Sequence, residues 1–155
     1  MKVLGFRGDP KAPRYAVVSE TGGAYKLENA ANDNKLPVPA SIGEDANAER
    51  LDWLYREVLA IFDAHPGITM VMIKQNEYTP NDTKAKRKSA HADAVVVLAC
   101  AHHGIPVELK TYASIPTTSK DTRRHAETRV GKTDRHWDDK MADAVNAAWC
   151  GLRNS

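Results

Sequence analysis

The sequence lacks the features that mark membrane-spanning and disulfide-stabilised proteins. No apolar run approaches the roughly 18 residues that a membrane span requires, and the charges at Lys2 and Arg7 come too early for a signal peptide. Cysteine is scarce, since Cys100 and Cys150 are the only two, and both lie within apolar helical patterns. We therefore expect reduced core cysteines and a cytoplasmic protein with no membrane association.

The bulk composition is that of a soluble globular chain. With 155 residues, of which 42% are hydrophobic and 27% charged, it predicts one domain over residues 1–155 with a proper core. The net charge of +2 hides an uneven distribution: residues 43–63 carry six acids and two bases, whereas residues 83–89 carry four bases and no acid. Residues 119–135 carry six bases and three acids. Such asymmetry favours a basic surface that meets phosphate groups, against the alternative of solvated helix ends and loops.

The segment at residues 68–75, Ile-Thr-Met-Val-Met-Ile-Lys-Gln, is the most informative stretch of the chain. It is a continuous apolar run with β-branched residues, and it follows Pro66-Gly67. This pattern predicts a strand buried on both faces at the centre of an α/β sheet. The run ends in Lys74, and in open α/β sheets functional sites lie outside the carboxyl ends of the strands. Lys74 is therefore a candidate functional residue.

The segments on either side predict an ordered series of strands and helices. Alternating patterns between turns predict strands at residues 2–8, 14–20, 24–28 and 105–112. Apolar residues at helical spacing predict helices at residues 45–64, 82–103 and 136–152, with a helical turn at residues 121–127. The order β-β-β-α-β-α-β-α predicts an α/β fold with a five-stranded mixed sheet and helices on both faces, which is the ribonuclease H-like fold.

Several short stretches, taken in order, resemble one known family. They are residues 3–6 followed by residues 15–18, then Ile73-Lys74-Gln75, the basic segment ending at Gly131-Lys132, and residues 140–145. Over nearly its whole length the chain resembles the RuvC-type Holliday-junction resolvases. This resemblance implies a nuclease in which clustered carboxylates hold two divalent metal ions, Mg²⁺ or Mn²⁺, that clamp the attacking and leaving oxygens.

The positions that the resemblance assigns to metal ligands are largely not carboxylates in this chain. The first-strand aspartate of the family falls on Arg7, and the fourth-strand glutamate falls on Lys74. The first of the two final aspartates falls on Lys140, and only the last is retained, as Asp143. A cation cannot ligate Mg²⁺ and repels it in a site of low dielectric. The resemblance therefore implies a degenerate cluster of Arg7, Lys74 and Asp143, with no catalytic residue, metal or cofactor expected.

The alternative is a shifted acidic site that keeps nuclease activity. Asp9-Pro10 resembles an Asp-Pro dipeptide of the family displaced by two residues, Glu77 lies three positions after Lys74, and Asp139 and Asp143 share a helix face at i, i+4 spacing. These four acids would rebuild a site for Mg²⁺ or Mn²⁺. Two hypotheses thus stay open, a nuclease-dead binding module and a divergent metal-dependent endonuclease.

Basic residues in two segments predict contacts with nucleic acid. Cations in the first turns of a helix oppose its dipole, so their presence at the start of the helix at residues 82–103 indicates a phosphate-facing role. The predicted contacts are Lys84, Lys86, Arg87, Lys88, Arg123, Arg124, Arg129 and Lys132. The partner is expected to be nucleic acid, DNA rather than RNA, or a protein, with a homodimer as a further arrangement.

One more expectation concerns the buried charge at the end of the central strand. A desolvated ammonium without a partner is costly, and the resemblance brings Lys74 and Asp143 to one cleft. We therefore expect these two side chains within salt-bridge distance or bridged by a water molecule, with Arg7 on the same cluster.

Overall fold

The computed structural model describes residues 1–32 and 34–155, and its centre is a mixed sheet of five strands. The strands are β1 (Lys2–Arg7), β2 (Arg14–Thr21), β3 (Ala24–Leu27), β4 (Ile68–Lys74) and β5 (Val107–Lys110). They lie in the order β3-β2-β1-β4-β5. The pairs β1/β2 and β2/β3 are antiparallel, whereas β1/β4 and β4/β5 are parallel. The fold class and topology predicted from the sequence are confirmed.

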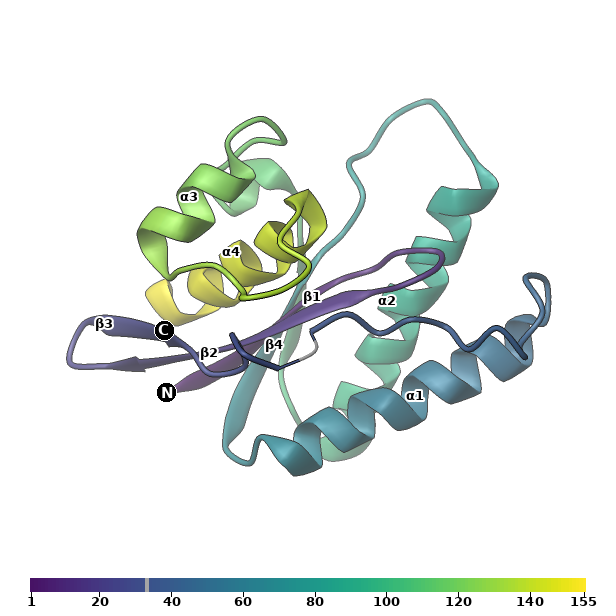
Figure 1. Cartoon of the computed structure of the whole chain (residues 1–155), viewed down its shortest axis with the longest axis horizontal. Coiled ribbons are helices and arrows are strands. Elements are labelled where there is room, and N and C mark those ends of the chain that lie inside the picture. The colour runs from purple at the N-terminus through teal and green to yellow at the C-terminus, as the bar shows by residue number, and fades with distance from the viewer. Residues whose placement is uncertain (33) are drawn as a thin grey trace.

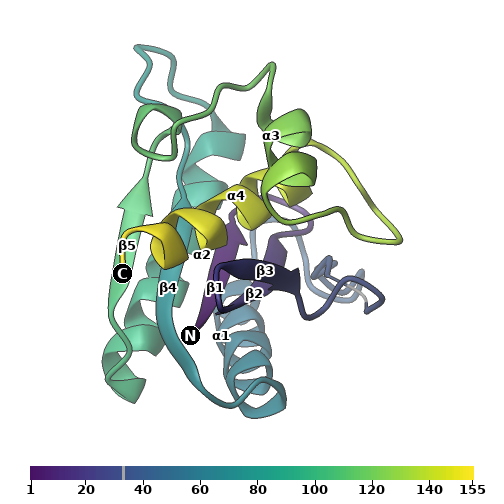
Figure 2. The same cartoon turned by 90° about the vertical axis from the view of Figure 1, so that its left-hand side faces the viewer.

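Helices cover both faces of this sheet. One face carries α1 (Asn47–Ala64) and α2 (Lys84–His103), and the other carries α3 (Thr122–Arg129) and α4 (Asp139–Arg153), as Figures 1 and 2 show. A short 3₁₀ turn, η1 (Tyr112–Ser114), follows β5. In Figure 2, α4 crosses in front of β1 and β4 while α1 and α2 lie behind them. Two hydrophobic layers therefore enclose the central strands.

Successive side chains of the central strands enter opposite layers. Val3 and Val18 pack with α4, whereas Leu4 and Val17 pack with α1 and α2. This alternation is why the central strands read as continuous apolar runs rather than alternating ones. The prediction for the central strand holds only for its second half, because β4 is fully buried only from Val71 onward.

Close backbone packing brings α4 directly over β1. A Cβ atom built on Gly5 would lie only 1.8 Å from the carbonyl oxygen of Ala144, so no larger residue fits at position 5. Gly151 also lies close to β4, because its Cβ would come within 2.7 Å of the Met72 side chain. The missing side chains let α4 approach the sheet closely, and this contact places Asp143 beside the carboxyl end of β1.

The helix starts differ from the predicted ones because side-chain caps determine them. The sequence predicts a helix from Asp82, a residue type suited to cap it, but Thr83 accepts a hydrogen bond from the Lys86 backbone N–H at 3.1 Å and is the cap of α2. The last helix was expected to begin near residue 136, but Asp138 caps it by accepting from the Met141 N–H at 2.8 Å. Each cap satisfies a backbone donor that the first helical turn leaves free.

Other expectations concern cysteines and membranes. Cys100 and Cys150 are both free and buried, as predicted for core residues. Within residues 1–32 and 34–155, no helix combines the length and the apolar character needed to cross a membrane.

Candidate functional site

The carboxyl ends of β1 and β4 bring the first two candidate residues together. Arg7 and Lys74 are register partners in the parallel pair β1/β4, so both end their strands at the same edge of the sheet. Asp143 reaches the same place from α4, and its Oδ2 accepts a hydrogen bond from Nε of Arg7 at 3.1 Å. The Arg7 side chain is 12% exposed and that of Asp143 is 2% exposed. The fold therefore assembles the three positions that the sequence assigned to one cluster.

Asp143 is fully engaged by protein donors. Besides Arg7, its carboxylate accepts from the Tyr112 hydroxyl at 3.0 and 3.1 Å and from Oγ1 of Thr122 at 2.7 Å. Burial raises the pKa of Asp143, and the Thr122 hydrogen bond and the charges of Arg7 and Lys74 oppose that rise. The one retained carboxylate thus has its oxygen atoms occupied by side chains of this chain.

Lys74 lies in the same cluster but does not form the expected ion pair. Its side chain is among the largest fully buried ones, at 1% exposure. Its Nζ donates to the backbone carbonyl of Gln75 at 2.5 Å and lies 3.8 Å from the centroid of the Tyr112 ring. Burial and the neighbouring Arg7 lower the pKa of Lys74, although Asp143 favours its charged form. The expected direct ion pair is therefore wrong, because Arg7 pairs with Asp143 and the Lys74 ammonium lies against the Tyr112 ring.

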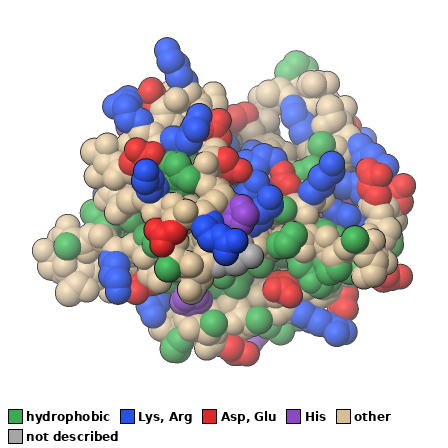
Figure 3. All heavy atoms as spheres, in the orientation of Figure 1, with side chains coloured by type: hydrophobic (Ala, Val, Ile, Leu, Met, Phe, Trp, Pro, Cys, Tyr) green, Lys and Arg blue, Asp and Glu red, His purple; other side chains and the backbone are tan. Residues whose placement is uncertain are grey.

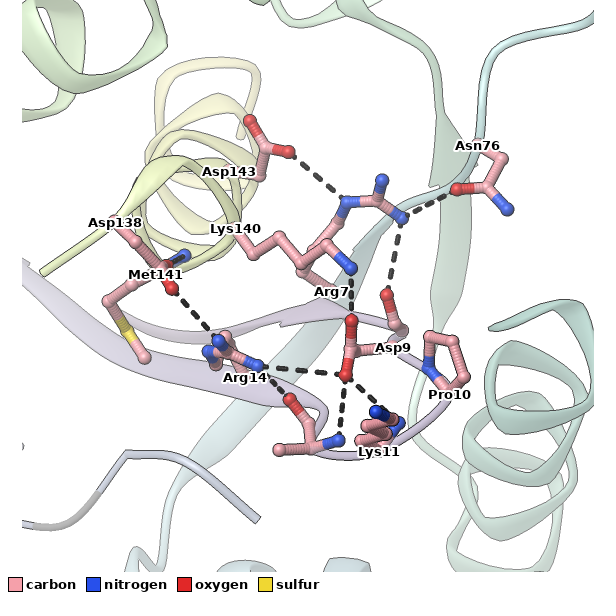
Figure 4. A network of polar contacts seen from close by, with 12 residues as sticks. Arg7, Asp9, Pro10, Lys11, Arg14, Asn76, Asp138, Lys140, Met141 and Asp143 are labelled. Carbon is pink, nitrogen blue, oxygen red and sulfur yellow. Dashed lines mark hydrogen bonds and ion pairs between the residues drawn. The ribbon is translucent and has the colours of Figure 1, made fainter. Parts of the chain in front are cut away.

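A second polar cluster lies next to the first, around the turn after β1 (Figure 4). Asp9 bonds to Lys140, lies 3.9 Å from Arg14, and accepts from the backbone N–H groups of Lys11 and Ala12 at 3.0 and 2.7 Å. Burial opposes ionisation of Asp9, but the hydrogen bonds from Lys140 and the backbone outweigh it and lower its pKa. Asp9 and Lys140 therefore neutralise each other.

The four acids of the alternative metal site do not come together. Asp139 is 58% exposed and pairs with Arg123 at 2.8 Å, whereas Asp143 is buried beside Arg7. Glu77 accepts from the backbone N–H of Tyr112 at 2.9 Å, and Asp9 belongs to the second cluster. In the part of the chain that the structure describes, no group of three or more His, Cys, Asp or Glu side chains is placed to hold a metal ion. Spacing along α4 suggested a shared face for the two aspartates, but their surroundings differ.

Sequence reasoning missed Asp93, a buried acid in the middle of α2. It is 3% exposed, and its Oδ1 has no hydrogen-bond partner among the described residues. That atom lies against Gly8, where an added Cβ would meet it at 2.6 Å. Burial raises the pKa of Asp93 to about 7, although Arg7 and Lys74 pull it down. The available signal was a single acid within an apolar stretch of helix, at residues 92–101.

These residues do not fit the pair of divalent ions that the family resemblance implies. The Arg7 guanidinium already bonds to the one retained carboxylate, and the Lys74 ammonium is buried beside it. A divalent cation at this edge of the sheet would face two fixed positive charges. The residues at this edge therefore provide two cations and one carboxylate that is already paired, rather than a set of metal ligands.

The predicted nucleic-acid contacts differ in how freely they face solvent. On α2, Lys84 pairs with Asp45 at 2.8 Å and Arg87 with Asp82 at 2.6 Å, so local acids offset the unfavourable helix dipole. Lys86 donates to the carbonyl of Asn81 at 2.9 Å, and the side chain of Lys88 is only 9% exposed, beside Asp45.

The second basic segment contains one structural arginine and several exposed cations. Arg129 lies 4.0 Å over the Trp149 ring and donates to the Pro116 carbonyl at 2.7 Å, so it holds α3 to α4. Arg123 and Arg124 have side chains that are 58% and 68% exposed. Lys132 is exposed and, among the described residues, has no ion-pair partner. Arg129 is thus held by contacts within the protein, whereas Arg123, Arg124 and Lys132 are exposed to solvent.

Comparison with known proteins supports the fold alone. No protein-family model matches this sequence, and no curated protein matches it. The structure is similar to Thermus thermophilus RuvC in complex with a Holliday junction substrate, with a TM-score of 0.78 and 15% identity, over 98% of this chain and 92% of that chain. A second Thermus thermophilus RuvC structure gives a TM-score of 0.76 and 14% identity, over 98% and 93% of the two chains. The chain therefore has the RuvC-type, ribonuclease H-like fold that its sequence predicted.

Proposed function

We propose that this protein binds nucleic acid, DNA in preference to RNA, and does not cleave it by metal-dependent chemistry. The observation that carries the proposal is the ion pair between Arg7 and Asp143 at the carboxyl ends of the central strands. It places a fixed cation where the resemblance implies metal ions. A site of this kind favours phosphate groups and disfavours the metals that would cut between them.

The positions of the basic segments support the same function. Thr122, the first residue of α3, donates to Asp143, and the loop after Lys74 leads into α2. The second basic segment therefore contacts the cluster, and the first ends at Ser89, whose backbone carbonyl lies against Gly8 in the turn after β1. Figure 3 shows a surface hollowed between the α3 side and the side of the loop after β4, with Lys and Arg side chains around the hollow and some Asp and Glu side chains among them. A negatively charged strand fits such a basic hollow through its phosphates.

Salt-dependent binding tests this function. We expect the protein to bind fluorescent four-way DNA junctions and duplexes at low salt, with an affinity that falls by about 0.9 log unit per log unit of salt for each phosphate contacted. The paired substitution of Arg123→Gln with Lys132→Gln should reduce that slope by about 2. It should do so on all DNA sequences alike, because phosphate contacts carry no base information.

Matched charges elsewhere provide the control. Arg56 pairs with Asp52 on α1, as Arg123 pairs with Asp139, and Lys26 on β3 is 73% exposed. Arg56→Gln with Lys26→Gln removes the same number of charges and should leave the salt slope unchanged. Absence of binding at low salt, or an equal loss in the control, would point to a protein partner instead. Cleavage of the junction in Mg²⁺ or Mn²⁺ would favour the divergent endonuclease.

A further inference from the structure

The guanidinium of Arg7 has one donor group that no residue in the described part of the chain uses. Its Nε bonds to Asp143 at 3.1 Å, and its Nη1 bonds to Oδ1 of Asn76 at 3.0 Å and to the Gly8 carbonyl at 3.3 Å. Among the described residues, Nη2 has no partner, and it is not one of the buried atoms left without one. In Figure 4 no dashed line reaches this third nitrogen. It is therefore open to a ligand from solvent.

The acceptors that hold Arg7 come from three separate parts of the fold. Asp143 lies on α4, Asn76 in the loop after β4, and Gly8 in the turn after β1. A side chain with this many anchors has few rotamers left to lose when it binds a ligand. Binding through the free nitrogen therefore costs little conformational entropy. The geometry resembles a preorganised receptor more than a simple ion pair.

The charges around Arg7 are mixed. Asp143 balances only one of the two cations at the strand ends, and Lys74 behind it bonds to a backbone carbonyl and a ring rather than to a carboxylate. Two further acids lie near these cations: Glu77, which accepts from the Tyr112 backbone N–H, and Asp93, whose burial raises its pKa to about 7. An anion at Nη2 is therefore held by the charge-assisted hydrogen bond from the guanidinium itself rather than by a large excess of positive charge.

We propose that Arg7 binds one backbone phosphate directly through its free guanidinium edge, in place of the metal ions implied at this position. The guanidinium plane and a phosphate match well, and charge-assisted hydrogen bonds of this kind are among the strong ones. The inference rests on the proposed function, because the phosphate belongs to the nucleic acid held between the two basic segments. The cluster thereby serves as a phosphate-binding site, or phosphate seat, that holds one phosphate of the strand without a metal ion.

Two variants that break the same ion pair separate this role from a structural one. Both Arg7→Gln and Asp143→Asn remove the contact, but only the first removes the phosphate donor. Arg7→Gln should weaken DNA-junction binding at least about 10-fold, whereas Asp143→Asn, which loses one of the three anchors of Arg7 but keeps the phosphate donor, should weaken it clearly less. Arg7→Lys keeps the charge but lacks the planar guanidinium, so its affinity for the junction should lie between those of the unaltered protein and Arg7→Gln. Equal losses in Arg7→Gln and Asp143→Asn would overturn the proposal.

A neutral phosphate analogue locates the contact on the strand. Single methylphosphonate substitutions are scanned along one arm of the junction, and one position should weaken binding of the unaltered protein but not of Arg7→Gln. The same loss in both proteins at every position would overturn the assignment to Arg7. Binding of DNA with no Arg7-dependent position would leave the proposed function standing and remove only this inference.

A titration with inorganic phosphate tests the seat without nucleic acid. Phosphate should shift the side-chain nitrogen resonances of Arg7 in the unaltered protein, and an equal concentration of chloride should not. If Arg7 responds to phosphate while no DNA binds, the seat stands and the proposed function fails. If DNA binds and the Arg7 resonances respond to neither phosphate nor DNA, the phosphate seat is wrong.

Discussion

Nε of Arg7 lies 3.1 Å from Oδ2 of Asp143, and this contact joins two residues 136 positions apart in the chain. It connects the end of β1 to α4 at the edge where the resemblance implies a metal pair. Arg7 thereby neutralises the one retained carboxylate, and the protein's own cation takes the place that a metal ion would need.

Restoring carboxylates should restore metal affinity. We expect no measurable Mg²⁺ or Mn²⁺ binding by calorimetry in the unaltered protein, because Arg7 and Lys74 repel the ion. The double substitution Arg7→Asp with Lys74→Glu places three carboxylates together, so Mn²⁺ should bind and raise the melting temperature. Adding Asp143→Asn to this variant should abolish the effect. A site in the unaltered protein that is lost in Asp143→Asn would contradict the expectation.

The Arg7–Asp143 pair should show a large coupling in a double-mutant cycle. Removing one partner of a buried ion pair costs about 3–5 kcal/mol, because the other charge stays buried alone. Arg7→Met and Asp143→Asn should therefore each lower the free energy of unfolding in urea, and the double variant should recover about 1–3 kcal/mol. A parallel cycle with Lys74→Met should give a smaller coupling, since Lys74 makes no direct ion pair. Strictly additive losses for Arg7 and Asp143 would show that the contact between them contributes nothing to the free energy of unfolding.

Asp93 should make stability depend on pH. Its pKa is about 7 in the folded protein and 3.8 ordinarily, so between these values the folded state binds more protons than the unfolded state. Stability from this group is present at low pH and is lost as the pH rises from about 4 to about 7, by an amount on the order of a few kcal/mol. Asp93→Asn cannot ionise. In urea denaturation, the free energy of unfolding of Asp93→Asn should therefore exceed that of the unaltered protein by an amount that grows from pH 5 to pH 8. Parallel pH profiles for the two proteins would disprove the effect of burial.

Two arginines of the second basic segment should behave in opposite ways. Arg129 is held by Trp149 and the Pro116 carbonyl, so Arg129→Gln should lower the free energy of unfolding by about 1–3 kcal/mol without changing the salt slope of DNA binding. Arg123 is 58% exposed, so Arg123→Gln should reduce the slope by about 0.9 and leave stability within about 0.5 kcal/mol. Unfolding curves and binding at several salt concentrations separate the two, and the reverse result would reassign them.

Much of the fold was readable in local patterns. The β-branched run before Lys74, the glycine and proline turns, and the apolar spacing of α1 and α4 predicted the element types and their order. Burial of apolar surface selects strand and helix by periodicity, which is written along the chain. The helix starts were less accessible, because whether Thr83 or Asp82 caps α2 depends on which oxygen reaches the free N–H groups.

The positions of the strands in the sequence therefore account for which residues lie at the ends of β1 and β4, since strand register brings Arg7 beside Lys74. Packing alone decided which charges pair there. Gly5 lets α4 approach until Asp143 meets the Arg7 guanidinium, and the Tyr112 ring takes up the Lys74 ammonium. Asp93 became part of the site only through the fold, because a lone acid in an apolar helix has no visible partner in sequence. Pairing of buried charges depends on distances of a few ångströms, which residue spacing along the chain does not specify.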